Sequence, residues 1–161
     1  MRPGKGGGCQ TGRPPAVLLI SFERGLSIGS SRLFLPIGSS IPAEPSSSSV
    51  TALLPAWQAA EFIQQTLDSL SAQDYGNFRV LVSVDLCDDA TLDLCRDHAA
   101  ADDRSTVIRQ DRRLGYVGNC NFLLSQADSD YVLFAFHDDV LAPTYVGRLA
   151  EVLDARPEVM A

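Results

Sequence analysis

The sequence has few basic residues, and Lys5 is its only lysine. Its 161 residues include 13 Lys and Arg against 20 Asp and Glu, which gives a formal net charge of -7. Surfaces that bind nucleic acids need clustered basic side chains to contact the phosphates. The composition therefore argues against a nucleic-acid partner.

Cysteine patterns that bind metal or form disulfides are also missing. The four cysteines occur without a CxxC pair or a regular spacing, so neither a structural zinc site nor a disulfide framework is indicated. Disulfide-poor proteins are typical of reducing compartments. We therefore expect a cytoplasmic location.

Long apolar runs are absent too, since no stretch approaches the ~20 residues that span a bilayer. The nearest candidate is the apolar run 16–22, which follows Lys5 and Arg13 as in a signal peptide. Glu23 and Arg24 end this run, and no convincing small-residue cleavage pattern follows. We expect no transmembrane segment in this chain.

The first 49 residues differ in composition from the rest. They include Gly6-Gly7-Gly8, Pro14-Pro15 and four serines at 46–49, and their apolar residues occur in short islands. Such segments lack the sustained periodicity of helices or strands. We predict a disordered or low-complexity leader over 1–49 and one folded domain over 50–161, because 45% apolar content is enough for a single core.

Beyond residue 49, short apolar runs alternate with amphipathic stretches, which is typical of βα units and a mainly parallel sheet. We predict strands over 50–54, 78–84, 106–109 and 131–136. The first should stop at Pro55, because proline cannot donate to a strand ladder. The last is almost wholly apolar, as expected of an interior strand covered on both faces.

Helices are predicted between these strands and after the last one. Helical spacing places Ala59, Phe62, Ile63, Thr66, Leu67 and Leu70 on one apolar face. Asp88 or Asp89 is well placed to cap the second helix. A final helix should begin near Pro143, since proline suits a first helical turn.

The notable polar residues follow the predicted strands, at the carboxyl ends where open α/β sheets bind ligands. The first strand leads into Pro55, Ala56 and Trp57, the second into Asp85, the third into Arg112 and Arg113, and the fourth into His137, Asp138 and Asp139. We expect these four loops to converge on one rim.

The acidic pair Asp138-Asp139 follows a buried strand, where two close carboxylates repel each other. A divalent cation, Mg²⁺ or Mn²⁺, would neutralise them and could join them to substrate phosphates. His137 could bind the metal, tune the ionisation of the carboxylates or contact a phosphate. Alternatively, the aspartates cap the helix near Pro143 or lie in solvent.

Arg112, Arg113 and Trp57 also have two interpretations each. The arginines could pair with a phosphate or with neighbouring carboxylates, or they could form an ordinary solvated surface. The tryptophan could stack on a base or line a pocket, or it could be buried beside Pro55.

Several segments resemble the family-2 glycosyltransferases with the GT-A fold, and the likeness covers nearly all of 50–160. The similar segments are the strand and proline turn at 50–57, the helix at 62–73, the segments 82–85 and 88–91, the glycine-bearing loop at 114–121, and 134–143. The last resembles the DxD segment of the family. The resemblance implies a Rossmann-like GT-A fold, C-terminally truncated, with a mainly parallel sheet and flanking helices.

This resemblance implies that the chain carries the donor- and metal-binding half of an inverting glycosyltransferase, which moves a sugar from a nucleotide-diphosphate sugar to an acceptor hydroxyl. Asp85 matches the carboxylate that contacts the base, and Pro55, Ala56 and Trp57 would shape its pocket. Asp138 would bind Mn²⁺ or Mg²⁺, with Asp139 or His137. Arg112 or Arg113 would aid the phosphates.

The resemblance also implies a saccharide, lipid or protein acceptor, a role in polysaccharide assembly, and a location in the cytoplasm or at the inner face of the membrane. The family's catalytic base lies in an acceptor-binding half, which we expect beyond Ala161. The catalytic residue is therefore unknown from this sequence.

Two departures from the family pattern keep an alternative open. Phe136 stands at the first acidic position of the DxD segment, with His137 at the middle one, and Cys120 stands where many members have arginine. A noncatalytic nucleotide-sugar-binding or interaction module is the second hypothesis. A phosphoreceiver domain ranks lower, because it needs a rim lysine and Lys5 lies in the leader.

Overall fold

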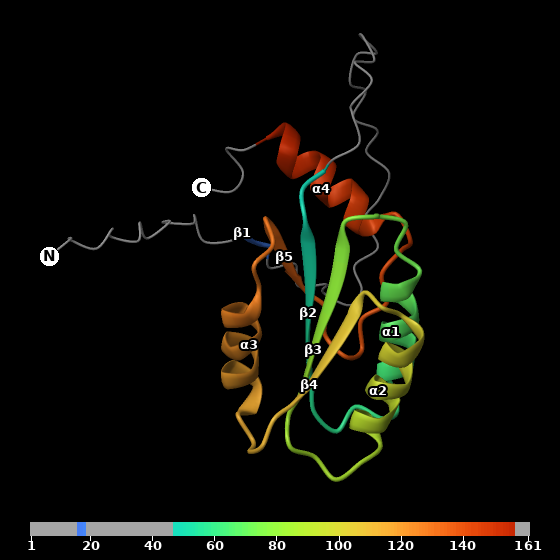
Figure 1. Ribbon diagram of the computed structural model, residues 1–161, viewed down its shortest axis with the longest axis vertical. Helices are drawn as coiled ribbons and strands as arrows, with labels where there is room; N and C mark the ends of the chain where they lie inside the picture. Colours follow the sequence, from blue (N-terminus) through green and yellow to red (C-terminus); the bar gives the residue numbers. More distant parts are fainter. Residues whose placement is uncertain (1–15, 19–46, 157–161) are drawn as a thin grey trace, which may run out of the picture.

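A parallel sheet forms the centre of the molecule in the computed structural model, which describes residues 16–18 and 47–156 (Figure 1). The described strands are β1 (Ala16–Leu18), β2 (Val50–Ala56), β3 (Phe78–Val84), β4 (Ser105–Arg109) and β5 (Tyr131–Phe134). They lie in the order β1-β5-β2-β3-β4, and every neighbouring pair is parallel. The predicted α/β class with a mainly parallel sheet is confirmed.

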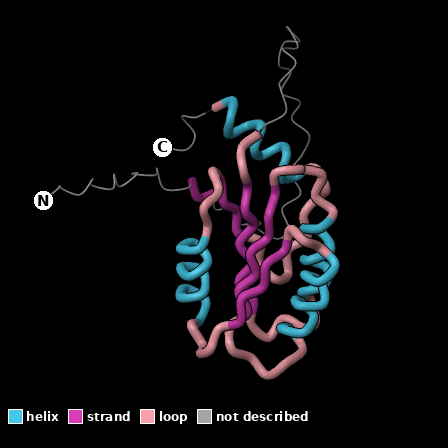
Figure 2. Tube along the Cα trace, viewed as in Figure 1, coloured by secondary structure: helices cyan, strands magenta, loops and turns pink. Residues whose placement is uncertain are grey.

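Helices cover both faces of this sheet, as Figures 1 and 2 show. They are α1 (Ile63–Ser71), α2 (Thr91–Ala101), α3 (Gly115–Gln126) and α4 (Tyr145–Ala155). On the α3 face, Leu53, Leu123 and Val132 form a small buried cluster. Leu54 points to the opposite face, since side chains alternate along a strand, and packs in the larger cluster with residues of α1, α2 and α4.

The predicted leader is described only at residues 16–18 and 47–49. Ala16–Leu18 pairs with β5, so these three residues belong to the sheet. Ser49 precedes β2, and its N–H and Oγ donate to Asp130 Oδ2 at 2.8 and 2.7 Å. The remainder of the leader lies outside the described residues, and its disorder stays a prediction.

The first strand is longer than predicted, because β2 continues through Pro55 to Ala56. The carbonyl of Leu53 accepts from Ala135 on the β5 side, and that of Ala56 accepts from Asp85 on the β3 side. Successive residues face alternate sides of a strand, so Pro55 faces the β5 side. Pairing with β5 reaches only as far as Leu53. No ladder bond therefore needs a donor from Pro55, and the prediction that the strand stops there was wrong.

The fourth predicted strand is shorter than expected, since β5 ends at Phe134 rather than Phe136. A tight local turn follows it. The N–H of Asp139 donates to the carbonyl of Phe136 at 2.9 Å, and the N–H of Phe136 donates to Asp139 Oδ2 at 3.0 Å. Short polar side chains of this kind compete with the sheet for backbone groups. Asp139 thus helps to end the strand.

Two helix predictions also need correction. Phe62, expected on the apolar face, precedes α1 and is 46% exposed. The N-cap residue of α2 is Ala90 rather than Asp88 or Asp89. Asp89 still contributes at this end, because its Oδ1 accepts the N–H of Thr91 at 3.2 Å.

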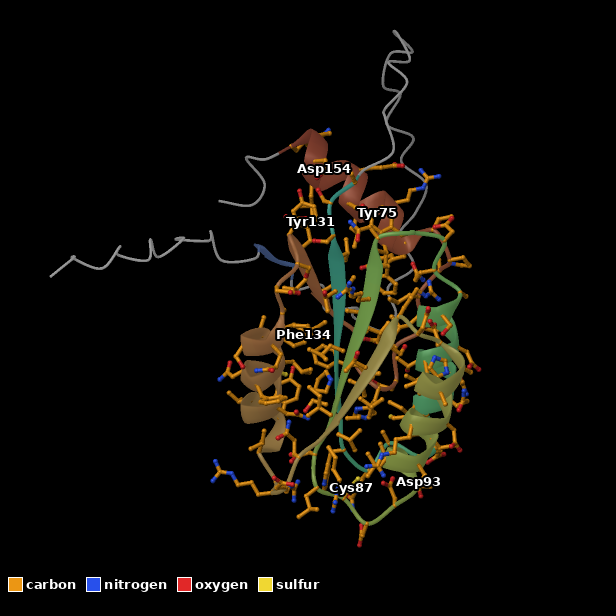
Figure 3. The ribbon with its side chains drawn as sticks, viewed as in Figure 1. Tyr75, Cys87, Asp93, Tyr131, Phe134 and Asp154 are labelled. Carbon is orange, nitrogen blue, oxygen red and sulfur yellow. The ribbon has the colours of Figure 1, made fainter. Side chains whose placement is uncertain are left out.

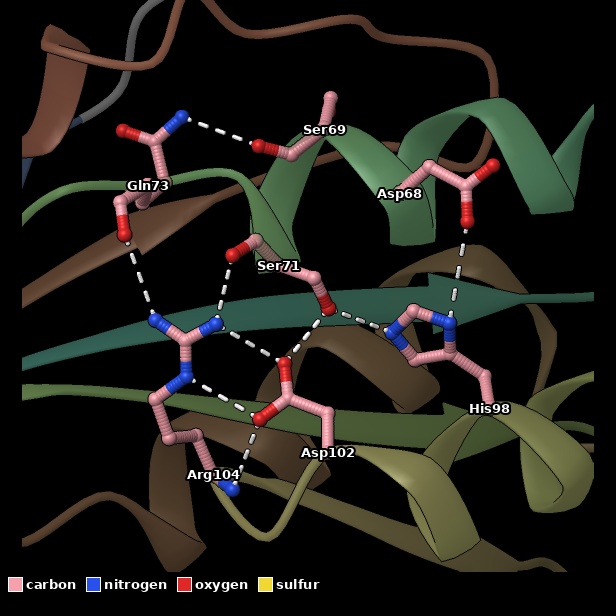
Figure 4. A network of polar contacts seen from close by, with 7 residues as sticks. All are labelled: Asp68, Ser69, Ser71, Gln73, His98, Asp102 and Arg104. Atoms are coloured by element: carbon pink, nitrogen blue, oxygen red, sulfur yellow. Dashed lines mark hydrogen bonds and ion pairs between the residues drawn. The ribbon is translucent and has the colours of Figure 1, made fainter.

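A polar network joins the carboxyl ends of α1 and α2 to the start of β4 (Figure 4). Ser71 Oγ donates to Asp102 Oδ2 at 2.5 Å and lies 2.8 Å from His98 Nε2. Arg104 donates to both carboxylate oxygens of Asp102, at 3.0 Å each, and to the carbonyl of Ser71 at 2.6 Å. The serine proton is directed at Asp102 rather than at the imidazole, so the network is structural and not a nucleophile–base pair.

This network predicts a pH dependence of stability. Hydrogen bonds from Arg104 hold the pKa of Asp102 well below its ordinary value of about 3.9. A carboxyl with a depressed pKa in the folded state stabilises fully above its unfolded pKa and loses this effect as the pH falls through the folded pKa. We expect the free energy of unfolding to fall below about pH 4, and Asp102→Asn to make this fall shallower. Urea denaturation at pH 7 and at acid pH measures both.

The exposed Asp97 of α2 supplies the control, since its side chain makes no hydrogen bond or ion pair with the described residues. The free energy of unfolding of Asp97→Asn should fall with decreasing pH as steeply as that of the unmodified chain. A slope equally steep in Asp102→Asn would contradict the role of Asp102.

Candidate nucleotide-sugar site

A cavity of about 280 Å³ lies at the carboxyl ends of the strands. It is bounded by the loops after β2, β3, β4 and β5, at the end of the sheet where Figure 3 labels Cys87. Its lining residues are Pro55, Ala56, Trp57, Asp85, Arg113, Gly115, Tyr116, Asn119, Phe136 and His137. The four strand-end loops therefore converge on one site.

Asp85 anchors this site. Its side chain is 3% exposed, and its carboxylate accepts three backbone N–H groups. Leu114 and Leu86 donate to Oδ1 at 2.7 and 3.0 Å, and Gly115 donates to Oδ2 at 2.8 Å. Gly115 has a φ of 71°, a left-handed conformation that favours glycine. The carboxylate thus ties the end of β3 to the start of α3 and fixes one wall of the cavity.

Trp57 and Arg113 form a second wall. The guanidinium of Arg113 lies 3.8 Å from the centroid of the Trp57 ring, which is a cation–π contact. Trp57 is 36% exposed, so it lines the cavity rather than being buried beside Pro55. Gln58, which follows, has a φ of 46°, and its Nε2 donates to Asp88 Oδ1 at 3.3 Å. The backbone turns sharply here, directly after the tryptophan.

Of the two arginines in this loop, the geometry brings only Arg113 to the cavity. Arg112 is exposed, does not line the cavity, and makes no hydrogen bond, ion pair or cation–π contact within the described part of the chain. Neighbouring positions in an irregular loop point in different directions, which the sequence alone does not specify. The inclusion of Arg112 in the site stays a prediction without geometric support.

The Trp57–Arg113 contact can be tested by fluorescence, because the chain has one tryptophan. We expect Arg113→Ala to expose the Trp57 ring to water and shift its emission to longer wavelength. Loss of an exposed cation–π contact should cost only about 0.5–1 kcal/mol of stability. Arg112→Ala removes the same charge from the adjacent position and should leave the spectrum unchanged. Equal spectra for both variants and the unmodified chain would contradict the contact.

Aromatic residues outside the predicted site complete the cavity. The rings of Phe134 and Phe136 are stacked, with centroids 6.0 Å apart and an interplanar angle of 3°. The centroid of Tyr116 lies 5.8 Å from that of Phe136. Both residues lie in segments that carry the resemblance described above, Phe136 in 134–143 and Tyr116 in 114–121. Only the structure shows that their rings lie together in one apolar wall.

Of the three residues after β5 that were predicted to bind a metal, only one lines the cavity. His137 lines the cavity and is half-buried, whereas Asp138 is exposed and its side chain makes no hydrogen bond or ion pair with the described residues. Asp139 Oδ2 is engaged by the Phe136 N–H. Within residues 47–156, no group of three His, Cys, Asp or Glu side chains gathers to hold a metal. The N-cap of α4 is Thr144, so neither aspartate caps that helix.

These residues still fit a divalent cation that takes only some of its ligands from the protein. Mg²⁺ and similar ions are commonly held by one or two carboxylates together with substrate phosphates and water. Asp138 offers a free carboxylate beside the cavity-lining His137, and one oxygen of Asp139 remains outside the turn. A cation bound here would need the substrate to supply further ligands.

Residues 51–161 match the family described as glycosyl transferase family 2. The chain belongs to this family. Glycosyltransferase GlyA of Streptococcus pneumoniae is 28% identical over 100 residues, which cover 62% of this chain and 14% of the relative. An uncharacterized glycosyltransferase of Haemophilus influenzae is 23% identical over 70% of this chain and 35% of its own length. The chain thus spans a minor part of the curated relatives it matches.

Two solved structures share the fold of this chain. TarS of Staphylococcus aureus superposes with a TM-score of 0.63 at 25% identity, over 68% of this chain and 20% of TarS; its 1–349 fragment is known in complex with UDP. A mannosyltransferase of Pyrobaculum calidifontis, solved with GDP-Man and Mn²⁺, gives a TM-score of 0.62 at 23% identity, over 66% of this chain and 32% of that one. The GT-A fold predicted from the resemblance is confirmed. No described helix is long and apolar enough to cross a membrane.

Proposed function

We propose that this chain carries the donor- and metal-binding part of an inverting glycosyltransferase that uses a nucleotide-diphosphate sugar. The observation that carries the proposal is the cavity formed by all four strand-end loops, with Asp85 in one wall and Trp57 in another. Its volume of about 280 Å³ lies just below the ~300–1,000 Å³ of small-molecule sites. This size suits the base and ribose, with the diphosphate and sugar extending along the rim.

Each wall of the cavity has a role in this binding mode. Trp57, Tyr116 and Phe136 provide apolar surface for a planar base and a ribose. Arg113 presents fixed donors at the mouth, where its guanidinium could pair with a phosphate. Asp85 holds the loop that carries Gly115, so the apolar and polar walls keep their spacing.

The acidic segment would bind the diphosphate of the donor, which leaves with the nucleoside when the sugar is transferred. Asp138, with Asp139 or His137, would bind Mn²⁺ or Mg²⁺ together with the diphosphate, and the cation would stabilise the negative charge that develops on the leaving nucleoside diphosphate. An acceptor hydroxyl would lose its proton to a carboxylate and attack the anomeric carbon. We place that base outside this chain, and we propose a saccharide, lipid or protein acceptor in polysaccharide assembly at the cytoplasmic face of a membrane.

A titration with Mn²⁺ and nucleoside-diphosphate sugars tests the metal assignment. We expect saturable binding that depends on the cation and that Asp138→Ala weakens about tenfold or more, the loss of one charged ligand contact. Asp128→Ala removes an exposed carboxylate at the other end of the sheet and should bind as the unmodified chain does. Unchanged binding in Asp138→Ala would reject the assignment.

A noncatalytic nucleotide-sugar-binding module is the second candidate. Phe136 occupies the first acidic position of the segment and stacks on Phe134, so this position supplies an apolar contact instead of a ligand. Donor hydrolysis and transfer, measured in a protein that includes the acceptor-binding half, separate the two. Binding without turnover would favour the module.

A further inference from the structure

The turn that carries Trp57 into the cavity wall is held at both of its ends. Before the tryptophan, the carbonyl of Ala56 accepts a backbone N–H from the end of β3 at 2.8 Å. After it, Ala59 is fully buried, and its N–H donates to Thr91 Oγ1 at 2.8 Å. Only Trp57 and Gln58 lie between these two fixed points. The φ of 46° at Gln58 is unfavourable for a side-chain-bearing residue and persists only where surrounding contacts impose it.

Two side chains of the connection between β3 and α2 supply these contacts. Asp89 Oδ2 accepts the N–H of Ala60 at 3.1 Å and the hydroxyl proton of Thr91 at 2.8 Å. A hydroxyl has one proton, so the bond to Asp89 leaves the lone pairs of Thr91 for the N–H of Ala59. Two consecutive backbone amides are thus bound by a hydroxyl and a carboxylate that also bind each other. Figure 1 shows the two connections side by side at this end of the sheet.

These contacts go beyond what the start of α2 needs. The helix uses only Asp89 Oδ1, which accepts the N–H of Thr91 at 3.2 Å. The other carboxylate oxygen and the hydroxyl reach out of the helix, to amides 29 and 32 residues earlier in the chain. Thr91 is 0% exposed, so water cannot replace its hydroxyl as the partner of Ala59.

We infer that Asp89 and Thr91 are positioning residues, which set the place of Trp57 in the cavity wall and thereby the affinity for the nucleotide. The effect on affinity rests on the proposed function, whereas the effect on Trp57 does not. A wall that is fixed before binding need not be ordered when the ligand arrives, so the ligand binds more tightly. The guanidinium of Arg113 lies 3.8 Å from the centroid of the Trp57 ring, so a displaced ring would also lose this contact.

Thr91→Val tests the inference, because it keeps the backbone bond to Asp89 Oδ1 and removes only the hydroxyl that binds Ala59. We expect acrylamide to quench the emission of Trp57, the single tryptophan, more strongly than in the unmodified chain. GDP and UDP, each titrated with Mg²⁺, should bind at least about tenfold more weakly. Thr91→Ser retains the hydroxyl and should restore both properties. Thr66→Val is the matched control, since Thr66 is also 0% exposed but its Oγ1 has no partner among the described residues.

A second pair of variants covers the case in which Thr91→Val does not fold. Asp89→Ala removes the carboxylate that binds Ala60, and Asp93→Ala removes an exposed carboxylate from the first turn of the same helix. We expect stronger quenching of Trp57 and weaker nucleotide binding in Asp89→Ala alone.

The two readouts separate the possible failures. Quenching of Trp57 that is unchanged in the folded Thr91→Val or Asp89→Ala variant would overturn the positioning role. Stronger quenching with unchanged nucleotide affinity would overturn the link between the position of Trp57 and binding. If the unmodified chain bound neither nucleotide, the proposed function would fail, and the quenching comparison would still decide whether Asp89 and Thr91 position Trp57.

Discussion

Asp85→Ala is expected to weaken nucleotide binding by at least about 100-fold and to lower the free energy of unfolding by about 3 kcal/mol. The side chain is buried, and its carboxylate accepts the N–H groups of Leu86, Leu114 and Gly115. Its removal releases the loop that begins α3, and with it one wall of the cavity. Binding calorimetry and urea denaturation of the same preparation measure the two effects.

Asp111→Ala is the matched control for this variant. Asp111 also follows a strand, but it is exposed and its side chain makes no hydrogen bond or ion pair with the residues that the structure describes. Its replacement should change both quantities little. If Asp85→Ala were as stable as Asp111→Ala, the three amide contacts would not hold the loop.

Leu54→Ala should lower the free energy of unfolding by about 3 kcal/mol, within the ~2–5 kcal/mol of buried leucine truncations. Leu54 is fully buried in the central strand β2, in the cluster that joins the sheet to α1, α2 and α4. The reason is lost apolar contact plus the cavity that remains, since packed interiors relax only partly. Urea denaturation with a two-state fit gives the change.

Val152→Ala is the corresponding control, because Val152 is 50% exposed on α4. It should cost less than about 1 kcal/mol. A loss equally small in Leu54→Ala would mean that the two faces of β2 are not packed as described.

The sequence predicted the parts of the fold that depend on apolar periodicity. The strand β3 has the predicted bounds of 78 to 84, and the loops after four strands converge as the parallel arrangement requires. The sequence places Trp57 and Asp85 at the cavity because each directly follows a strand, and the carboxyl ends of parallel strands lie at the same edge of the sheet. The position of a strand end determines where the residues within one or two positions of it lie.

Details that depend on tertiary contacts could not be predicted. Pro55 is tolerated inside β2 because its partner strand stops short of it, and no local rule specifies where a partner ends. The turn at Phe136 shortens β5 because Asp139 accepts its N–H. Arg113 rather than Arg112 reaches Trp57, since loop backbone sets the direction of each side chain.

The most direct test of the nucleotide site is a heteronuclear NMR titration of the ¹⁵N-labelled chain with GDP and UDP. If the nucleotide occupies the cavity, the indole N–H of Trp57 and the amides of Gly115 and Tyr116 will shift progressively and saturate. Signals at the opposite end of the sheet, such as those of Asn77 and Ser129, will stay in place. Shifts confined to that opposite end, or none at saturating nucleotide, would contradict the account.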